Sequence, residues 1–217
     1  LQTLFIISAG GDWMRPFRFM VPVLPFLYLF LEAGFMGTLR LDRGKINPGR
    51  RLVITSVFFL SVIIMNLWPW PRVWHFTNGY SQGLWRTSIS FGHWLERNAE
   101  PGDTIVLGDV GALPYYSGLR VIDLYGLVNP EIARLPGPAL YARQVDIGAI
   151  LDQKPRFIAL EAGARLKERV DRRILLEPRF QKEYVLVQQA KFSAGETTLL
   201  FERKKDNQDG KAESGLQ

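Results

Sequence analysis

The chain has 217 residues, of which 47% are hydrophobic and 22% charged, and its formal net charge is +6. This length suits one ordinary domain, or a smaller domain joined to something else. The absence of Cys excludes a disulfide scaffold and zinc sites built on thiolates, and two histidines, His75 and His93, are too few for a histidine-rich metal centre.

Long apolar runs occupy the first third of the chain. Leu4-Phe5-Ile6-Ile7 is typical of the last turns of a hydrophobic helix, so we interpret the sequence as a C-terminal piece of a longer protein. Residues 17–37 carry only Arg18 and Glu32 as charges, and residues 52–68 carry none. As helices these runs measure about 31 and 26 Å, enough to cross a bilayer. The sequence predicts two membrane spans here, because neither run has the polar face of a surface helix.

The segment between the spans sets their orientation. Residues 40–51 hold five Lys and Arg residues against Asp42 alone, and short loops of this kind stay in the cytoplasm. Residues 10–16, and everything after about Trp70, are therefore expected on the outer side. The net positive charge comes largely from this loop, so it gives no reason to propose nucleic-acid binding.

The remainder predicts a small extracytoplasmic α/β domain with a mixed sheet, because strands alternate with helices and end in a hairpin. After a connector at 75–85, we expect helices at 87–98, 112–117, 145–152 and 165–174, strands at 104–109, 120–124 and 156–160, and a hairpin from 183–189 and 197–203. The domain limits are 1–74 for the membrane helices and outer loop, 75–204 for the α/β domain and 205–217 for a disordered tail.

A first group of candidate residues lies in the outer loop, where Asp12, Arg15 and Arg18 stand at the mouth of the membrane helices. Ionisable groups near lipid need a partner or a task. A structural interpretation pairs Asp12 with either arginine to fix the loop. A functional one has a guanidinium bind a lipid phosphate through its planar fork of donors.

A second group lies in the α/β domain. Asp109 and Asp123 follow predicted strands, at the carboxyl edge where open parallel sheets bind ligands, and Tyr115 and Tyr116 are near in sequence. Two carboxylates and tyrosine rings would hold a sugar by hydrogen bonds and stacking. The structural alternative is a pair of turn or cap aspartates and a core tyrosine.

These two groups carry a resemblance. The stretches GGDWMRPFRFMVPVLP and PGDTIVLGDVGALPYYSGLRVIDLYGLVNPEIAR resemble the C-terminal portion of bacterial membrane glycosyltransferases of the C-type fold, such as the mycobacterial terminal β-arabinofuranosyltransferases, over about residues 8–135. The resemblance implies transfer of a sugar from a polyprenyl-phosphate donor to a cell-envelope glycan acceptor at the outer face of the inner membrane. Its catalytic base would lie in an N-terminal loop outside this sequence, so the fragment alone is expected to be inactive.

The resemblance also implies roles for the candidate residues. Arg15 or Arg18 would clamp the donor phosphate, with Asp12 as an orienting partner or as a ligand to a divalent cation. Asp109 and Asp123, with the tyrosines, would bind the acceptor. The alternatives are a non-enzymatic polytopic protein whose outer domain binds a glycan or a protein, a transport or polymer-export component, and a domain that only covers the membrane cavity of an enzyme.

Overall fold

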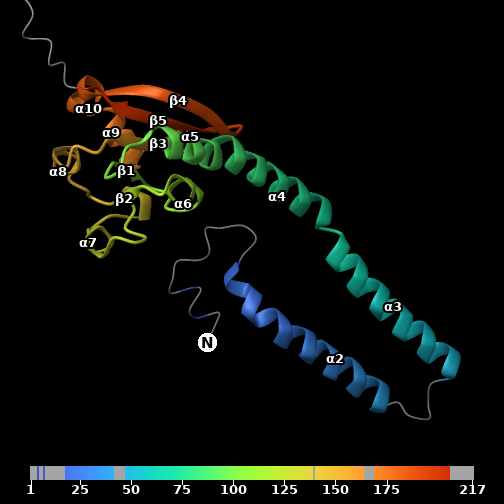
Figure 1. Ribbon diagram of the computed structural model, residues 1–217. Helices are drawn as coiled ribbons and strands as arrows, with labels where there is room; N and C mark the ends of the chain where they lie inside the picture. The colour runs from blue at the N-terminus through green and yellow to red at the C-terminus, as the bar shows by residue number, and fades with distance from the viewer. Residues whose placement is uncertain are drawn as a thin grey trace, which may run out of the picture. The chain divides into compact units, whose positions relative to one another are not determined.

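The computed structural model describes residues 4, 7, 18–41, 47–138, 140–163 and 169–205. The chain divides into two compact units, Leu1–Trp70 and Pro71–Gln217, which are shown in Figure 1 and are described separately below. The predicted tail lies outside the described residues from position 206 onward.

The first unit contains two apolar helices. A 3-10 helix, η1 (Arg18–Val23), leads into α2 (Leu24–Leu41). Proline disrupts α-helical geometry, and Pro22 lies in this more tightly wound segment, before the α-helix begins. Asn47 caps α3 (Pro48–Leu67) by accepting a hydrogen bond from the Gly49 N–H at 3.0 Å.

Two contacts join α2 to α3. The rings of Phe35 and Phe58 stack with centroids 4.1 Å apart, and the Tyr28 hydroxyl donates to Asn66 Oδ1 at 3.0 Å. Because the pairing runs in opposite directions along the two sequences, the helices form an antiparallel hairpin.

Apolar side chains of these helices are exposed, and α3 has no buried residue. A helical run from Pro48 to Asn98 contains an 18-residue window of mean hydropathy 2.0, none of it buried, so one helix among the described residues is long and apolar enough to cross a membrane. It includes the predicted span 52–68. The other predicted span is represented by a shorter apolar helix, Val21–Gly37.

The connector expected at 75–85 is helical, so that part of the prediction was wrong. Residues 70–98 form α4 (Trp70–Leu84), a π-helical turn η2 (Trp85–Ile89) and α5 (Ser90–Asn98). Gly83 packs against Phe192, whose carbonyl oxygen would lie 2.5 Å from an added Cβ, and the buried Thr87 hydroxyl donates to the Gly83 carbonyl at 2.9 Å. These tertiary contacts outweigh the weak helix propensity of glycine.

The second unit is built on a five-stranded sheet of order β2-β1-β3-β5-β4 (Figure 1). Strand β1 pairs in parallel with β2 and β3, whereas β5 pairs antiparallel with β3 and β4, so the predicted mixed sheet is confirmed. The strands are β1 (Thr104–Leu107), β2 (Arg120–Asp123), β3 (Phe157–Gly163), β4 (Tyr184–Ser193) and β5 (Glu196–Arg203).

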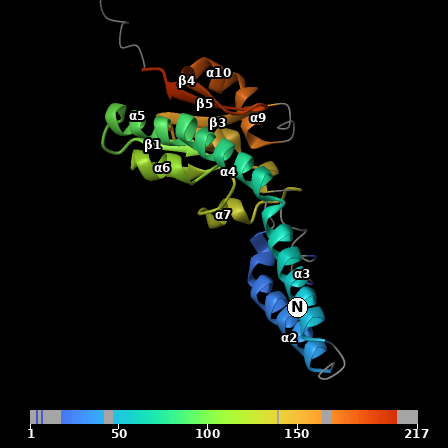
Figure 2. The same ribbon diagram turned by 90° about the vertical axis from the view of Figure 1, so that its right-hand side faces the viewer.

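Helices cover both faces of this sheet (Figure 2). On one face, α5 and α6 (Ala112–Ser117) bury a core that includes Phe91, Leu95 and Leu113 with Ile105 of β1. On the other face, α8 (Ile147–Asp152), α9 (Val170–Leu175) and α10 (Pro178–Glu183) pack around Val106 and Ile158. The short helices α7 (Pro130–Ala133) and η3 (Leu140–Ala142), like α10, were not predicted.

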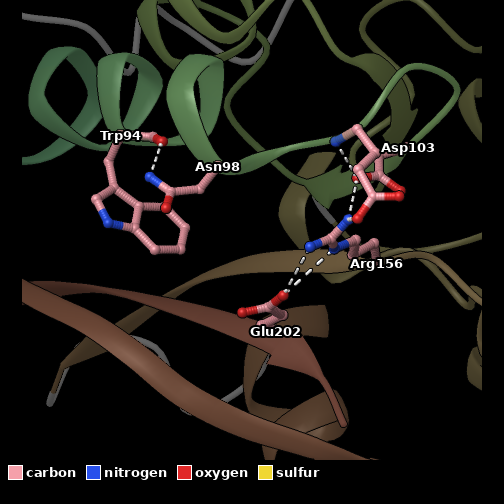
Figure 3. Close-up of polar contacts among 6 residues, drawn as sticks. Trp94, Asn98, Asp103, Arg156 and Glu202 are labelled. Atoms are coloured by element: carbon pink, nitrogen blue, oxygen red, sulfur yellow. Dashed lines mark hydrogen bonds and ion pairs between the residues drawn. The ribbon is translucent and has the colours of Figure 1, made fainter. Parts of the chain in front are cut away.

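Arg156 forms a network of hydrogen bonds and ion pairs at the amino edge of the sheet. The Arg156 guanidinium donates to Asp103 Oδ2 at 2.9 Å and to Glu202 Oε1 through two nitrogens at 3.2 Å, and it pairs with Glu100 at 3.0 Å (Figure 3). These contacts connect the turn before β1 to the start of β3 and the end of β5. Nearby, the Asn98 side chain donates to the Trp94 carbonyl at 2.7 Å and finishes α5.

Candidate functional site

The connections of two neighbouring strands make the carboxyl edge the expected ligand site. The chain leaves β1 for α6 on one face of the sheet and leaves β3 for α9 on the opposite face, although β1 and β3 are adjacent and parallel. Such a switch in direction opens a crevice between the carboxyl ends of the two strands. The residues that follow β1, and those that end β3, therefore define the candidate site.

Asp109 lies at this edge, two residues after the end of β1, as predicted, and it is exposed. Before it, Gly108 faces the Tyr125 ring so closely that an added Cβ would lie 2.3 Å from a ring carbon. The nearest atom to a Cβ added at Gly111 would be Asp109 Oδ1 at 3.2 Å. Gly108 thus allows the loop after β1 to pack directly on the Tyr125 ring.

Two hydrogen bonds to the buried Asp171 carboxylate stabilise the carboxyl edge. The Tyr125 hydroxyl donates to Asp171 Oδ2 at 2.7 Å, and the Glu161 main-chain N–H donates to Asp171 Oδ1 at 3.0 Å. Burial, and then the Asp171 and Glu161 charges, raise the pKa of Tyr125. The tyrosine therefore stays neutral and donates at every physiological pH, and it fixes α9 against the end of β1.

Glu161 and Arg169 form an ion pair beside this support. Burial raises the pKa of Glu161, Arg169 opposes the rise, and the Asp171 and Asp109 charges add to it. The Arg169 guanidinium carbon also lies 4.8 Å from the centroid of the Tyr141 ring. A half-buried carboxylate, a cation and an aromatic ring thus come together at the end of β3.

Tyr80 of α4 joins the same neighbourhood. Its pKa is raised by burial first and then by the charges of Asp109 and Glu161, so both carboxylates act on one hydroxyl. Carboxylates of the β1 loop and β3 can accept hydrogen bonds, and the Tyr80 phenol can donate one, which are the interactions that a polyhydroxylated ligand requires.

Asp123 plays a different part at this edge. It is 1% exposed, and its Oδ1 accepts from the N–H groups of Tyr125 and Gly126 at 2.8 and 3.0 Å. Its Oδ2 accepts from Val128 and Asn129 at 2.7 and 3.3 Å. Both oxygens are thus engaged by the main chain, and the geometry agrees with the turn-aspartate interpretation.

The two predicted tyrosines lie on α6. Tyr115 is 81% exposed, and its ring meets that of Tyr116 edge to face at 5.2 Å. Tyr116 packs on α5, with its ring centroid 4.8 Å from that of His93. Within the described part of the chain, no hydrogen bond joins either tyrosine to Asp109 or Asp123, so the structure does not unite the four predicted residues in one contact set.

The outer-loop candidates Asp12 and Arg15, and the side chain of Arg18, lie outside the described residues. Across the described ranges, no three His, Cys, Asp or Glu side chains are placed to hold a metal ion. An open hollow of about 420 Å³ is present, but it lies at the amino edge, between the end of α5 and the start of β2, and neither Asp109 nor Glu161 lines it.

Sequence reasoning missed Glu161, Arg169, Asp171 and Tyr125. Glu161 had a usable signal, because it ends an apolar strand run as Asp109 does. Asp171 had none, because its partner Tyr125 is 46 positions away in the sequence.

Comparison with known proteins gives one match. Residues 77–208 match a family model described as a domain of unknown function. This range begins in α4 and includes the whole sheet. No curated protein and no solved structure matches the chain.

Proposed function

We propose that this chain, which belongs to the DUF8728 family, described as a domain of unknown function, is part of an integral membrane glycosyltransferase. The enzyme moves a sugar from a polyprenyl-phosphate donor to a cell-envelope glycan acceptor. The apolar helices lie in the bacterial inner membrane, and the α/β domain lies on the outer side and binds the acceptor at its carboxyl edge.

The observation that carries the proposal is that two carboxylates, Asp109 after β1 and Glu161 near the end of β3, stand at the switch point of a sheet that follows apolar helices. Asp109 is exposed, and Glu161 is held by Arg169. Carboxylates of this kind accept hydrogen bonds from sugar hydroxyls, and the exposed face of Tyr141 suits stacking on a sugar ring. The basic loop at 40–51 supports the outward orientation.

The chemistry divides between the two units. A carboxylate in a part of the enzyme outside this sequence takes the proton from the acceptor hydroxyl as the hydroxyl oxygen attacks the sugar, and the bond from the sugar to the phosphate breaks. Arg15 or Arg18 stabilises the departing phosphate, and Asp12 orients the arginine or binds a divalent cation. Asp109 positions the acceptor.

The test uses the full-length enzyme in proteoliposomes with a radiolabelled polyprenyl-phosphate sugar. We expect Arg18→Ala to lower kcat severalfold or more and Asp109→Asn to raise the acceptor KM. The control is Arg97→Ala, which removes an exposed arginine near the end of α5. Transfer that is unchanged in both variants would contradict the proposal.

A second candidate is a membrane-anchored module that binds a glycan without transferring it. Asp123 and Asp171 are both engaged by structural hydrogen bonds, so neither offers a catalytic base in this sequence, and a binding module requires none. Glycan binding that depends on Asp109, in a full-length protein without transferase activity, would support this candidate.

A further inference from the structure

An apolar loop follows β2. Leu127 and Val128 are adjacent, and their exposed fractions are 52% and 67%. An exposed apolar pair on one loop can contact another protein or a membrane surface. They lie at the carboxyl edge, because Asp123 ends β2 and begins the loop.

The fold holds this loop in one conformation. Asp123 binds four of its main-chain N–H groups, as described above, and Gly126 has a φ of 74°. A Cβ added at Gly126 would lie 2.5 Å from the Ala133 nitrogen, so the loop packs directly on α7. The apolar pair is therefore presented by a preorganised backbone, which lowers the entropy cost of binding.

Helix α4 runs past the carboxyl edge of the sheet. The Tyr80 ring meets Phe192 at 5.3 Å near the end of the β4–β5 hairpin, where Glu196 pairs with Gly163 at the carboxyl end of β3. From there α5 runs toward the amino edge, because its end leads into β1. The earlier turns of α4 therefore extend beyond the carboxyl edge (Figures 1 and 2).

The beginning of α4 carries the aromatic residues expected at a membrane surface. Trp70 and Trp74 are 59% and 60% exposed. Along the helix axis, Trp74 lies about 9 Å from Tyr80. Figures 1 and 2 place α7, which follows the loop, on the side of the sheet toward which α4 extends.

We propose that Leu127 and Val128 dock into the headgroup region of the bilayer crossed by α3, and so hold the carboxyl edge against the membrane surface. This inference rests on the proposed function, because it requires α3 to span the membrane. Its consequence is that an acceptor bound at the candidate site lies next to the lipid surface, where the sugar of a lipid-linked donor is presented.

The test exploits the absence of cysteine. The full chain is placed in phosphatidylcholine and phosphatidylglycerol vesicles, with one valine at a time changed to cysteine and labelled with the fluorophore NBD. Val128→Cys tests the loop and Val57→Cys tests the middle of α3. The control is Val185→Cys, a 46% exposed valine on β4 that pairs with Glu202 beside the first residue of β3, at the amino edge.

We expect the Val128 label to be quenched by lipids with a doxyl group near the headgroup, and its quenching by aqueous iodide to be severalfold weaker than that of the Val185 label. The Val57 label is quenched by lipids with the doxyl group deep in the acyl chain. If the Val57 label is in lipid but the Val128 label is quenched by iodide like the control, the docking proposal is wrong and the span stands.

Two other outcomes also overturn the docking proposal. A Val128 label shielded from iodide but untouched by doxyl lipids indicates a protein surface over the loop. A Val57 label that no doxyl lipid quenches shows that α3 does not span the bilayer, and then the proposed function fails as well.

Discussion

Replacing Asp123 by Asn tests whether one buried carboxylate holds the carboxyl edge together. The amide keeps one acceptor oxygen and turns an NH₂ group toward two main-chain N–H groups, so two of the four hydrogen bonds are lost. Hydrogen bonds to a charged group contribute about 1.5–3 kcal/mol each, so we expect a loss of about 3–6 kcal/mol. This is a large part of the stability of an ordinary domain.

The assay is amide hydrogen exchange of the full chain in detergent micelles. In Asp123→Asn, peptides over 124–133 should exchange about 100-fold faster or more. The matched control is Asp146→Asn, because Asp146 is exposed and, among the residues that the structure describes, its carboxylate accepts only the Ala149 N–H, at 3.1 Å. Asn caps helices as well as Asp does, so the control should stay within about 0.5 kcal/mol. Equal exchange in both variants would refute the reasoning.

Three further predictions concern single residues. Arg156→Ala should lower the free energy of unfolding by about 1–3 kcal/mol, measured by denaturant titration, and an unchanged midpoint would contradict the role of its ion pairs. The raised pKa of Glu161 means that the folded chain binds this proton more tightly than the unfolded chain, so its stabilisation is complete below its ordinary value of 4.5 and is lost as the pH rises through the folded pKa. In Glu161→Gln, the melting temperature should fall less steeply with rising pH than in the wild type. An unchanged slope would contradict this account of Glu161. Gly126→Ala should cost about 2 kcal/mol more than Gly118→Ala, because both glycines have positive φ but only Gly126 meets backbone atoms; equal melting temperatures would contradict the clash.

The parts of the fold that the sequence predicted are those with local signals. The strand expected at 104–109 and found at 104–107, the helix 112–117 and the hairpin are bounded by Gly and Pro turns, and their apolar residues follow the expected periods. The helix over 75–85 was missed because Gly79 and Gly83 disfavour it locally, whereas Gly83 is required for the close packing on Phe192.

The candidate site, like the fold, was predictable only where the signal is local in the sequence. Asp109 and Asp123 were placed at the carboxyl edge, because strand ends can be recognised in the sequence. The division of roles between them was not, since it depends on which main-chain N–H groups surround each carboxylate. The pairing of Tyr125 with Asp171 depends on the order of the strands, which local patterns do not specify.

The topology of the chain is the central claim, and cysteine accessibility measures it most directly. In intact cells, a membrane-impermeant maleimide should label Lys191→Cys, which lies exposed on β4, and should label Asn47→Cys, at the start of α3, only after lysis. Labelling of Asn47→Cys in intact cells while Lys191→Cys is protected, or recovery of the chain in the soluble fraction, would contradict the account.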